Sequence, residues 1–214
     1  MALNSVNTNV GAMIALQNLQ VTNDELSQVQ SRINTGKKVS SAKDNGAVWA
    51  IAQNQRSEIG ALNAVKDSLQ RGQSATDVAV AAGESVSDLL LQLKEKALSA
   101  TDSSLTTSAR KALNEDFKSI RDQIATVVSN ASFNGVNLIN NSTGTNGYKA
   151  LSNATGSTIK VAPENLSLGG ANVTVAATTT IGTATLATTA LGLVNASINN
   201  VSASLARLGT GSKS

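Results

Sequence analysis

The stretch "INTGKKVSSAKDNGAVWAI", residues 33–51, decides the fold because it places a polar turn between two long helical patterns. Gly36 is typical of the end of a helix, and Lys37 and Lys38 then stand near the negative end of the helix dipole. The serine, aspartate and asparagine side chains of residues 40–45 can cap backbone groups. The turn is therefore predicted to end one helix and to begin the next directly after it.

The segment before the turn, residues 3–33, has the pattern of a long helix without surface charge. Apolar residues recur at spacings of three and four, which predicts one apolar stripe, and they are Leu3, Val6, Val10, Met13, Leu26, Val29 and Ile33. No charged residue precedes Asp24, although a helix with one face in water normally carries charges there. This helix is expected to meet neutral surroundings on every side.

Beyond the turn, a second helix is predicted from residue 46 or 47 to about residue 98, followed by a polar interruption at residues 101–107. Two later segments show the alternating spacing of a coiled-coil seam. Their apolar residues, expected to form the rod core, are Leu113, Phe117, Ile120, Ile124 and Val127 in one and Leu191, Val194, Ile198, Val201 and Leu205 in the other. The helix of the first group is expected to stop before "SFNGVNLIN".

Residues 140–185 differ in composition, since Thr, Ser, Asn and Gly dominate and charges nearly vanish. The alternating runs "STIKVAP" and "ANVTVAA" predict short strands in a small exposed insertion, with a disordered tract as the competing interpretation. The predicted fold class is mainly α, a long antiparallel, coiled-coil-like helical rod with a small β or loop insertion. The expected parts are residues 1–33, 34–46, 47–139, 140–185 and 186–214.

Composition argues against catalysis. The chain has no histidine and no cysteine, so the commonest general base, the commonest metal ligand and thiolate chemistry are absent. Its carboxylates are scattered along helices among lysines and arginines, as on solvated helix faces. We therefore expect no enzyme activity, no cofactor and no metal. The net charge of +3 and the short pairs Lys37-Lys38 and Arg110-Lys111 do not predict nucleic-acid binding, and no stretch predicts a membrane span.

Three segments together resemble bacterial flagellin, especially that of Caulobacter-like alphaproteobacteria. They are "MALNSVNTNVGAMIALQNLQ", "SRINTGKKVSSAKDNGAVWAIAQNQRSEIGALNAVKDSLQRGQSATDVAVAA" and "FNGVNLI". The resemblance is close over residues 1–140 and extends to residues 191–208 by pattern. It implies a secreted structural subunit that polymerises into the flagellar filament and serves motility. It also implies partners, namely copies of itself, other flagellins, an export chaperone, and filament cap or junction proteins.

The resemblance also implies where subunits pack. In flagellins the first helix lines the inner tube of the filament, and the turn lies where subunits meet. The expected assembly residues are Leu3, Val6, Val10, Met13, Ile14, Lys37, Lys38, Asp44, Asn45 and Trp49. The family ends with a further long helix that pairs with the first one. Because no such helix follows residue 208, we expect a truncated form or a naturally short relative.

Modification and immune sensing are further implications of the resemblance. Related flagellins are often O-glycosylated in the outer region, and the candidate acceptors are Thr143, Thr155, Ser157, Thr178, Thr179 and Thr180. The competing interpretation is that these are simply solvated hydroxyls. N-x-S/T sequons also recur, but are expected by chance in a chain so rich in Asn, Ser and Thr. Gln92, Lys96 and Asp116 stand where receptor-sensed flagellins carry arginine, leucine and glutamate, which predicts weak sensing.

Two alternative functions remain open from the sequence. A hook–filament junction protein shares the N-terminal pattern, but such proteins tend to have proline after the acidic pair, where this chain has Gly46. A soluble helical binding module or export adaptor would need no insert rich in Thr and Ser, and its first helix should carry surface charge. The filament subunit is therefore the leading prediction.

Overall fold

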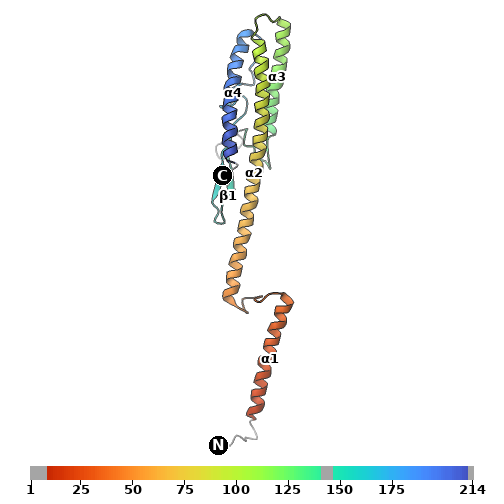
Figure 1. Ribbon diagram of the computed structural model, residues 1–214, viewed down its shortest axis with the longest axis vertical. Helices are drawn as coiled ribbons and strands as arrows, with labels where there is room; N and C mark the ends of the chain where they lie inside the picture. The colour runs from red at the N-terminus through yellow and green to blue at the C-terminus, as the bar shows by residue number, and fades with distance from the viewer. Residues whose placement is uncertain (1–8, 141–146, 212–214) are drawn as a thin grey trace. The chain divides into compact units, whose positions relative to one another are not determined.

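The computed structural model describes residues 9–140 and 147–211, and it confirms a mainly helical fold with one small sheet (Figure 1). The elements are α1 (Val10–Thr35), α2 (Gly46–Ala100), α3 (Thr107–Asn130), β1 (Tyr148–Leu151), β2 (Thr158–Val161) and α4 (Ala184–Gly211). The chain divides into two compact units, Met1–Gly60 and Ala61–Ser214, and α2 contributes residues to both.

The first unit contains α1, the polar turn and the start of α2. Asn9 caps α1, since its side chain accepts a hydrogen bond from the Ala12 N–H at 3.1 Å. Gly36 ends the helix with φ of 62°, a left-handed conformation in which glycine has no steric penalty. The expected helix of residues 3–33 therefore extends to Thr35, and its first residues lie outside the described part of the chain.

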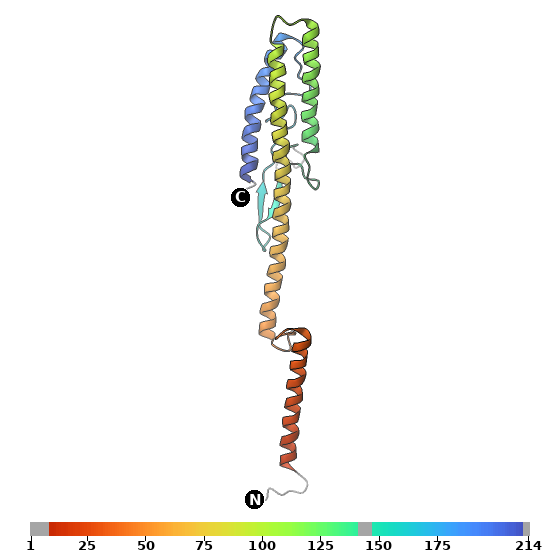
Figure 2. The same ribbon diagram turned by 45° about the vertical axis from the view of Figure 1, so that its right-hand side comes forward.

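In the second unit, α3 and α4 lie beside the later part of α2 and run antiparallel to it (Figures 1 and 2). The buried face of α2, which meets these helices and also the Tyr148–Leu151 strand, is apolar or small at spacings of three and four. Its buried residues are Val65, Ser68, Gly72, Ala75, Thr76, Ala79, Gly83, Val86, Leu90, Leu93, Ala97 and Ala100. This alternation keeps one stripe of α2 against its neighbours over many turns.

All ten expected rod-core residues contact this interior, but to different depths. Phe117, Ile124, Val194 and Val201 are fully buried. The other six are half-buried and pack against the core. Four polar residues of α3 and α4 are also buried in this interior, although the spacing of apolar residues did not predict them. They are Asn114, Arg121, Ser197 and Ser204.

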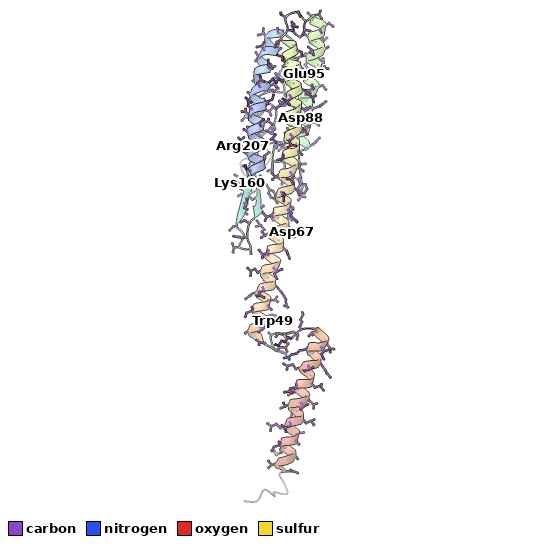
Figure 3. The ribbon with its side chains drawn as sticks, in the orientation of Figure 1. Trp49, Asp67, Asp88, Glu95, Lys160 and Arg207 are labelled. Atoms are coloured by element: carbon purple, nitrogen blue, oxygen red, sulfur yellow. The ribbon has the colours of Figure 1, made fainter. Side chains whose placement is uncertain are left out.

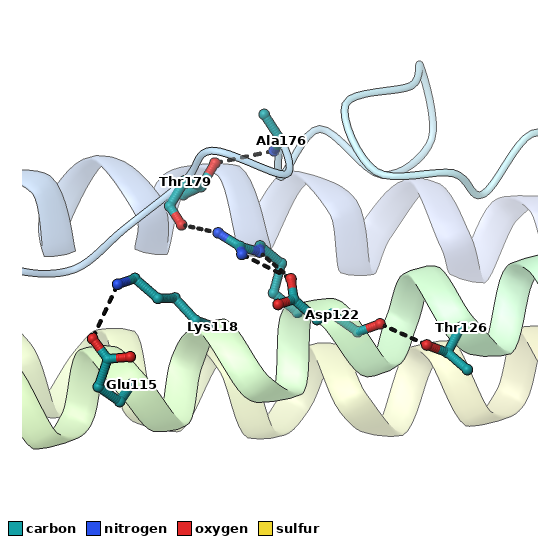
Figure 4. A network of polar contacts seen from close by, with 7 residues as sticks. Glu115, Lys118, Asp122, Thr126, Ala176 and Thr179 are labelled. Carbon is teal, nitrogen blue, oxygen red and sulfur yellow. Dashed lines mark hydrogen bonds and ion pairs between the residues drawn. The ribbon is translucent and has the colours of Figure 1, made fainter.

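The polar residues of α3 hold the chain that leads into α4. The Asn114 Oδ1 accepts a hydrogen bond from the buried N–H of Ile181 at 2.8 Å. One heptad later, Arg121 donates to the Thr179 carbonyl at 2.9 Å and pairs with Asp122 at 2.7 Å. Figure 4 shows the contacts around Asp122 and Thr179, with the Thr179 hydroxyl accepting a hydrogen bond from the Ala176 N–H. Each buried polar group therefore has a partner, as a stable interior requires.

The segment between α3 and α4 is more deeply packed than expected. β1 and β2 form an antiparallel hairpin in which Tyr148 faces Val161, so the strand predicted in "STIKVAP" is present. The strand predicted in "ANVTVAA" is wrong, because only an isolated bridge joins Leu168 and Val173 there. The expectation of an exposed insertion is also wrong for much of this segment, since its apolar side chains complete the core. The fully buried ones are Leu166, Val173, Val175 and Ile181.

A bidentate ion pair holds the last turns of α4 against this segment. The Arg207 Nε and Nη2 donate to the two carboxylate oxygens of Glu164 at 2.6 Å each, and Nη2 also donates to the Ser204 hydroxyl at 3.0 Å. Hydrogen bonding by Arg207 outweighs partial burial and lowers the pKa of Glu164. Figure 3 shows Arg207 beside Lys160 of β2 at this end of α4.

Candidate assembly surface

The first helix exposes an unusual amount of apolar surface. None of the residues of α1 is buried, and its large apolar side chains are between 46% and 74% exposed. They are Val10, Met13, Ile14, Leu16, Leu19, Val21, Leu26, Val29 and Ile33. Monomeric proteins rarely leave so much contiguous apolar surface in water, so α1 has the character of a contact surface.

The prediction of a single apolar stripe along this helix is wrong. At about 100° per residue, Leu26 lies about 160° around α1 from Val10. Met13 and Ile14 flank Val10, whereas Val29 and Ile33 lie on the side of Leu26. Apolar side chains therefore surround the helix, and residues 9–23 contain no charge. A helix that is apolar on more than one side is typical of a buried position.

The expected assembly residues divide between this helix and the turn. Val10, Met13 and Ile14 lie on one side of α1, while Leu3 and Val6 lie outside the described residues. Lys37 and Lys38 are exposed in the turn, and neither forms an ion pair with another described residue.

The turn is organised by Asp44. Its Oδ2 accepts hydrogen bonds from the Ser40 N–H at 2.9 Å, from the Ser40 hydroxyl at 2.7 Å and from the Ser41 N–H at 3.1 Å. The hydrogen bond from the Ser40 side chain is the largest of the contributions that lower the pKa of Asp44. A carboxylate in this position therefore fixes the path of the chain between the two helices.

Asn45 begins the second helix. Its Oδ1 accepts a hydrogen bond from the Val48 N–H at 3.1 Å, and its carbonyl accepts one from the Trp49 N–H at 3.0 Å. The first contact satisfies an N–H group that a helix start leaves without an internal partner, and the second is the first hydrogen bond of the helix itself. Trp49 follows in the first turns of α2, where it is 36% exposed (Figure 3).

Metal binding and membrane insertion can be examined in the part of the chain that the structure describes. No group of three or more acidic, histidine or cysteine side chains there could hold a metal ion. Within the same residues, no helix is both long and apolar enough to cross a bilayer.

The candidate O-glycosylation residues differ in accessibility. Thr155 and Ser157 are exposed at the tip of the hairpin, where both hydroxyls are hydrogen-bonded to the Asn153 side chain. Thr178 is exposed, whereas Thr179 and Thr180 are half-buried. Thr143 lies outside the described residues. Glycosylation of these residues stays a prediction.

The residues considered for immune sensing lie on the facing helices α2 and α3. Gln92 is exposed, and Lys96 donates to the Asp116 carboxylate at 3.0 Å. Spacing in the sequence did not reveal this pairing, because the two residues belong to different helices. Nor did it reveal the Glu164–Arg207 pair, whose partners are 43 residues apart.

Comparison with known proteins gives consistent matches. Residues 6–144 match the family model described as the bacterial flagellin N-terminal helical region. The flagellin FljM of Caulobacter vibrioides is 54% identical over 212 residues, covering 99% of this chain and 76% of that protein. Flagellin A of Rhizobium meliloti is 35% identical over 135 residues, covering 63% of this chain and 34% of that protein.

A solved structure supports the fold. The flagellin of Bacillus cereus superposes with a TM-score of 0.57 at 20% identity, covering 68% of this chain and 82% of that one. Flagellins are exported structural proteins that polymerise with one another into the extracellular flagellar filament and serve motility, and these matches do not favour a junction protein or an adaptor. Since the family model covers more than half of the chain and FljM is similar over nearly all of it, the chain belongs to the bacterial flagellin family and is a structural subunit of the flagellar filament.

Proposed function

We propose that the apolar side chains surrounding α1, together with the turn that follows, form the surface through which this subunit joins the filament. The observation that carries the proposal is the exposure of α1, none of whose side chains is buried. An isolated helix gains little stability in water without tertiary packing, so a partner that covers α1 also stabilises it.

The energetics favour burial by several neighbours. Full burial of one exposed aliphatic side chain is worth about 1.5–3 kcal/mol, and the nine large apolar side chains of α1 are already about half covered. Burying the remainder would contribute on the order of 10 kcal/mol, comparable with the ~4–15 kcal/mol cost of association. A single pairwise contact is therefore marginal, and a helix covered on more than one side is the favourable arrangement.

The absence of charge over residues 9–23 supports the same role. A charged side chain carried into a packed helical interface loses its hydration, which costs several kcal/mol unless a partner charge is placed nearby. Asparagine and glutamine side chains, which occupy the polar positions here, can instead hydrogen-bond across an interface. Lys37, Lys38 and Asp44 lie beyond this neutral part, in the turn.

The proposed division of the chain follows from this role. We assign residues 1–33 to the inner tube, residues 34–46 to the turn, residues 47–139 and 186–214 to the rod, and residues 140–185 to the short outer segment. The burial of Leu166, Val173 and Val175 supports a smaller exposed part than the whole of residues 140–185, namely the hairpin tip around Thr155.

The same apolar surface implies partners before and during assembly. A helix with this much uncovered apolar area is prone to aggregate, so a flagellar export chaperone is expected to shield the subunit inside the cell. Filament cap and junction proteins are expected to contact the subunits at the ends of the polymer. These partners are expected to contact the same neutral, apolar surface of α1 that a neighbouring flagellin contacts.

A charge-insertion experiment tests the proposal. Val10→Asp and Ile14→Asp each place a carboxylate on α1, and Gln123→Asp places one on the exposed, already charged face of α3 as a matched control. We expect the two α1 variants to form no filaments, as measured by electron microscopy and by sedimentation, whereas the control variant still forms them. Circular dichroism should show the same helix content in the α1 variants as in the control. Filaments of normal length from either α1 variant would refute the proposal.

A further inference from the structure

We propose that Asn134 is a site of spontaneous deamidation, in which the backbone nitrogen of Gly135 attacks the side-chain amide of Asn134. This modification site is independent of the role of α1 in assembly. It lies in the tight turn that follows α3, where Phe133 and Val136 exchange two backbone hydrogen bonds of 2.9 Å each. Asn134 and Gly135 form the turn itself, with φ values of 49° and 79°.

The turn leaves the reacting groups accessible. Both residues are exposed, and a Cβ atom placed on Gly135 would meet no heavy atom within 4 Å. Neither the Asn134 side chain nor the Gly135 N–H forms a hydrogen bond with another described residue. Because glycine has no side chain, its nitrogen is the least hindered of all backbone nucleophiles.

The reaction needs only water as co-reactant. The Gly135 nitrogen gives up its proton and forms a bond to the Asn134 Cγ, and the bond from Cγ to the amide nitrogen breaks, so that this nitrogen leaves as ammonia. The product is a five-membered succinimide ring. Water then adds to one of its two carbonyl carbons. Opening at one position gives aspartate, and opening at the other gives isoaspartate, whose backbone passes through Cβ. No group is oxidised or reduced.

The structure distinguishes this site from the other described Asn-Gly pair. Asn45 caps α2 through its Oδ1 and through its carbonyl, and Gly46 is the first residue of that 55-residue helix. Ring closure at Asn45 would break both contacts. The Asn134 turn is closed by one residue pair, and Asn134 and Gly135 themselves are exposed, so the rotation that brings the nitrogen to Cγ needs only a local opening of the turn. Asn146, before Gly147, lies outside the described residues.

The product would alter the turn. Isoaspartate adds one backbone atom and a negative charge to a two-residue connection whose neighbours, Phe133 and Val136, pack against the core. A two-residue turn of this kind depends on its length and on its positive φ values. Since the exported subunit is beyond the enzymes of the cytoplasm, the product would accumulate with the age of the filament.

Peptide mapping of the purified full chain during storage in mildly alkaline buffer tests the proposal. Mass spectrometry and methyl-acceptor labelling of isoaspartate measure the conversion of Asn134 and Asn45 in the same sample. We expect conversion of Asn134 to be at least several-fold faster. In the urea-unfolded chain, the two rates should approach each other, because the helix cap at Asn45 is lost.

Two variants complete the experiment. Gly135→Ala hinders the attacking nitrogen and should slow the conversion of Asn134 in the unfolded chain as well, where strain in the turn plays no part. Asn134→Asp carries no amide and should release no ammonia at this position. Equal native rates at Asn134 and Asn45, faster conversion of Asn45, or a native Asn134 that stays intact while the unfolded chain reacts would each overturn the proposal.

Discussion

Replacing Asn114 by leucine removes a polar contact that positions the chain before α4. Asn114 is 8% exposed, and its Oδ1 accepts the hydrogen bond of the fully buried Ile181 N–H at 2.8 Å. Leucine has a similar size but no acceptor, so this N–H would be left unpaired. An unsatisfied buried donor costs about 1–3 kcal/mol, a large share of the roughly 5–15 kcal/mol that stabilises a typical domain.

Urea unfolding, followed by circular dichroism, measures this loss. Asn199→Leu is the matched control, because Asn199 is an exposed mid-helix residue of α4 and the substitution changes helix propensity by the same amount. We expect Asn114→Leu to be less stable than this control by about 1–3 kcal/mol. We also expect the Ile181 amide hydrogen to exchange faster in Asn114→Leu. Equal stability of the two variants, with the Ile181 amide still protected, would show that the contact does not hold this segment.

Four further outcomes follow from the packing, the charges and the family resemblance. Phe117→Ala and Ile124→Ala should each lower the free energy of unfolding by about 2–5 kcal/mol through cavity formation. If urea unfolding showed no change in this free energy beyond experimental error for either variant, the described core would be contradicted. Gly72→Ala should destabilise the rod by about 1–3 kcal/mol because its Cβ would lie 2.8 Å from the Tyr148 ring, whereas Gly60→Ala, with open surroundings, should be neutral or slightly stabilising in the same melts. The hydrogen bonds of Arg207 hold the folded pKa of Glu164 below its unfolded value, so their stabilisation is complete above that value and is lost as pH falls through the folded pKa. Glu164→Gln should therefore reduce the dependence of the melting temperature on pH in the acid range, and an unchanged dependence would exclude this contribution. Sensing by the innate receptor should be weak, since Lys96 is a charge paired with Asp116 where an apolar contact is expected, and a reporter-cell response equal to that of a strongly sensed flagellin would refute this.

The sequence predicted the helices well because their signals are local. Gly36 and the side chains of residues 40–45 marked the turn, and the spacing of apolar residues marked α2, α3 and α4. The depth of each core position was less predictable. Asn114 and Arg121 occupy buried positions of the seam because distant backbone carbonyl and N–H groups pair with them, and no spacing in the sequence reveals those partners.

Two predictions from the sequence, the second strand and the single stripe on α1, were wrong for physical reasons. The alternation in "ANVTVAA" was interpreted as a strand, but Val173 and Val175 are buried in the core with only an isolated bridge to Leu168, and alternation alone does not distinguish these cases. The single stripe on α1 combined two groups of apolar residues that are separated by 13 residues, a distance at which the helical period has moved the second group to another side. The assembly residues came from the family resemblance, and their role stays a prediction.

Hydrogen exchange of α1, compared between monomer and filament, tests the central proposal most directly. In the purified monomer, at a concentration where light scattering detects no oligomers, the amides of residues 10–33 should exchange quickly, since no tertiary contact covers them. In the assembled filament the same amides should become strongly protected, while those of the α2–α3 seam should be protected in both states. Slow exchange of residues 10–33 in the monomer, or fast exchange of these residues in the filament, would contradict the proposal that α1 is the surface through which the subunits assemble.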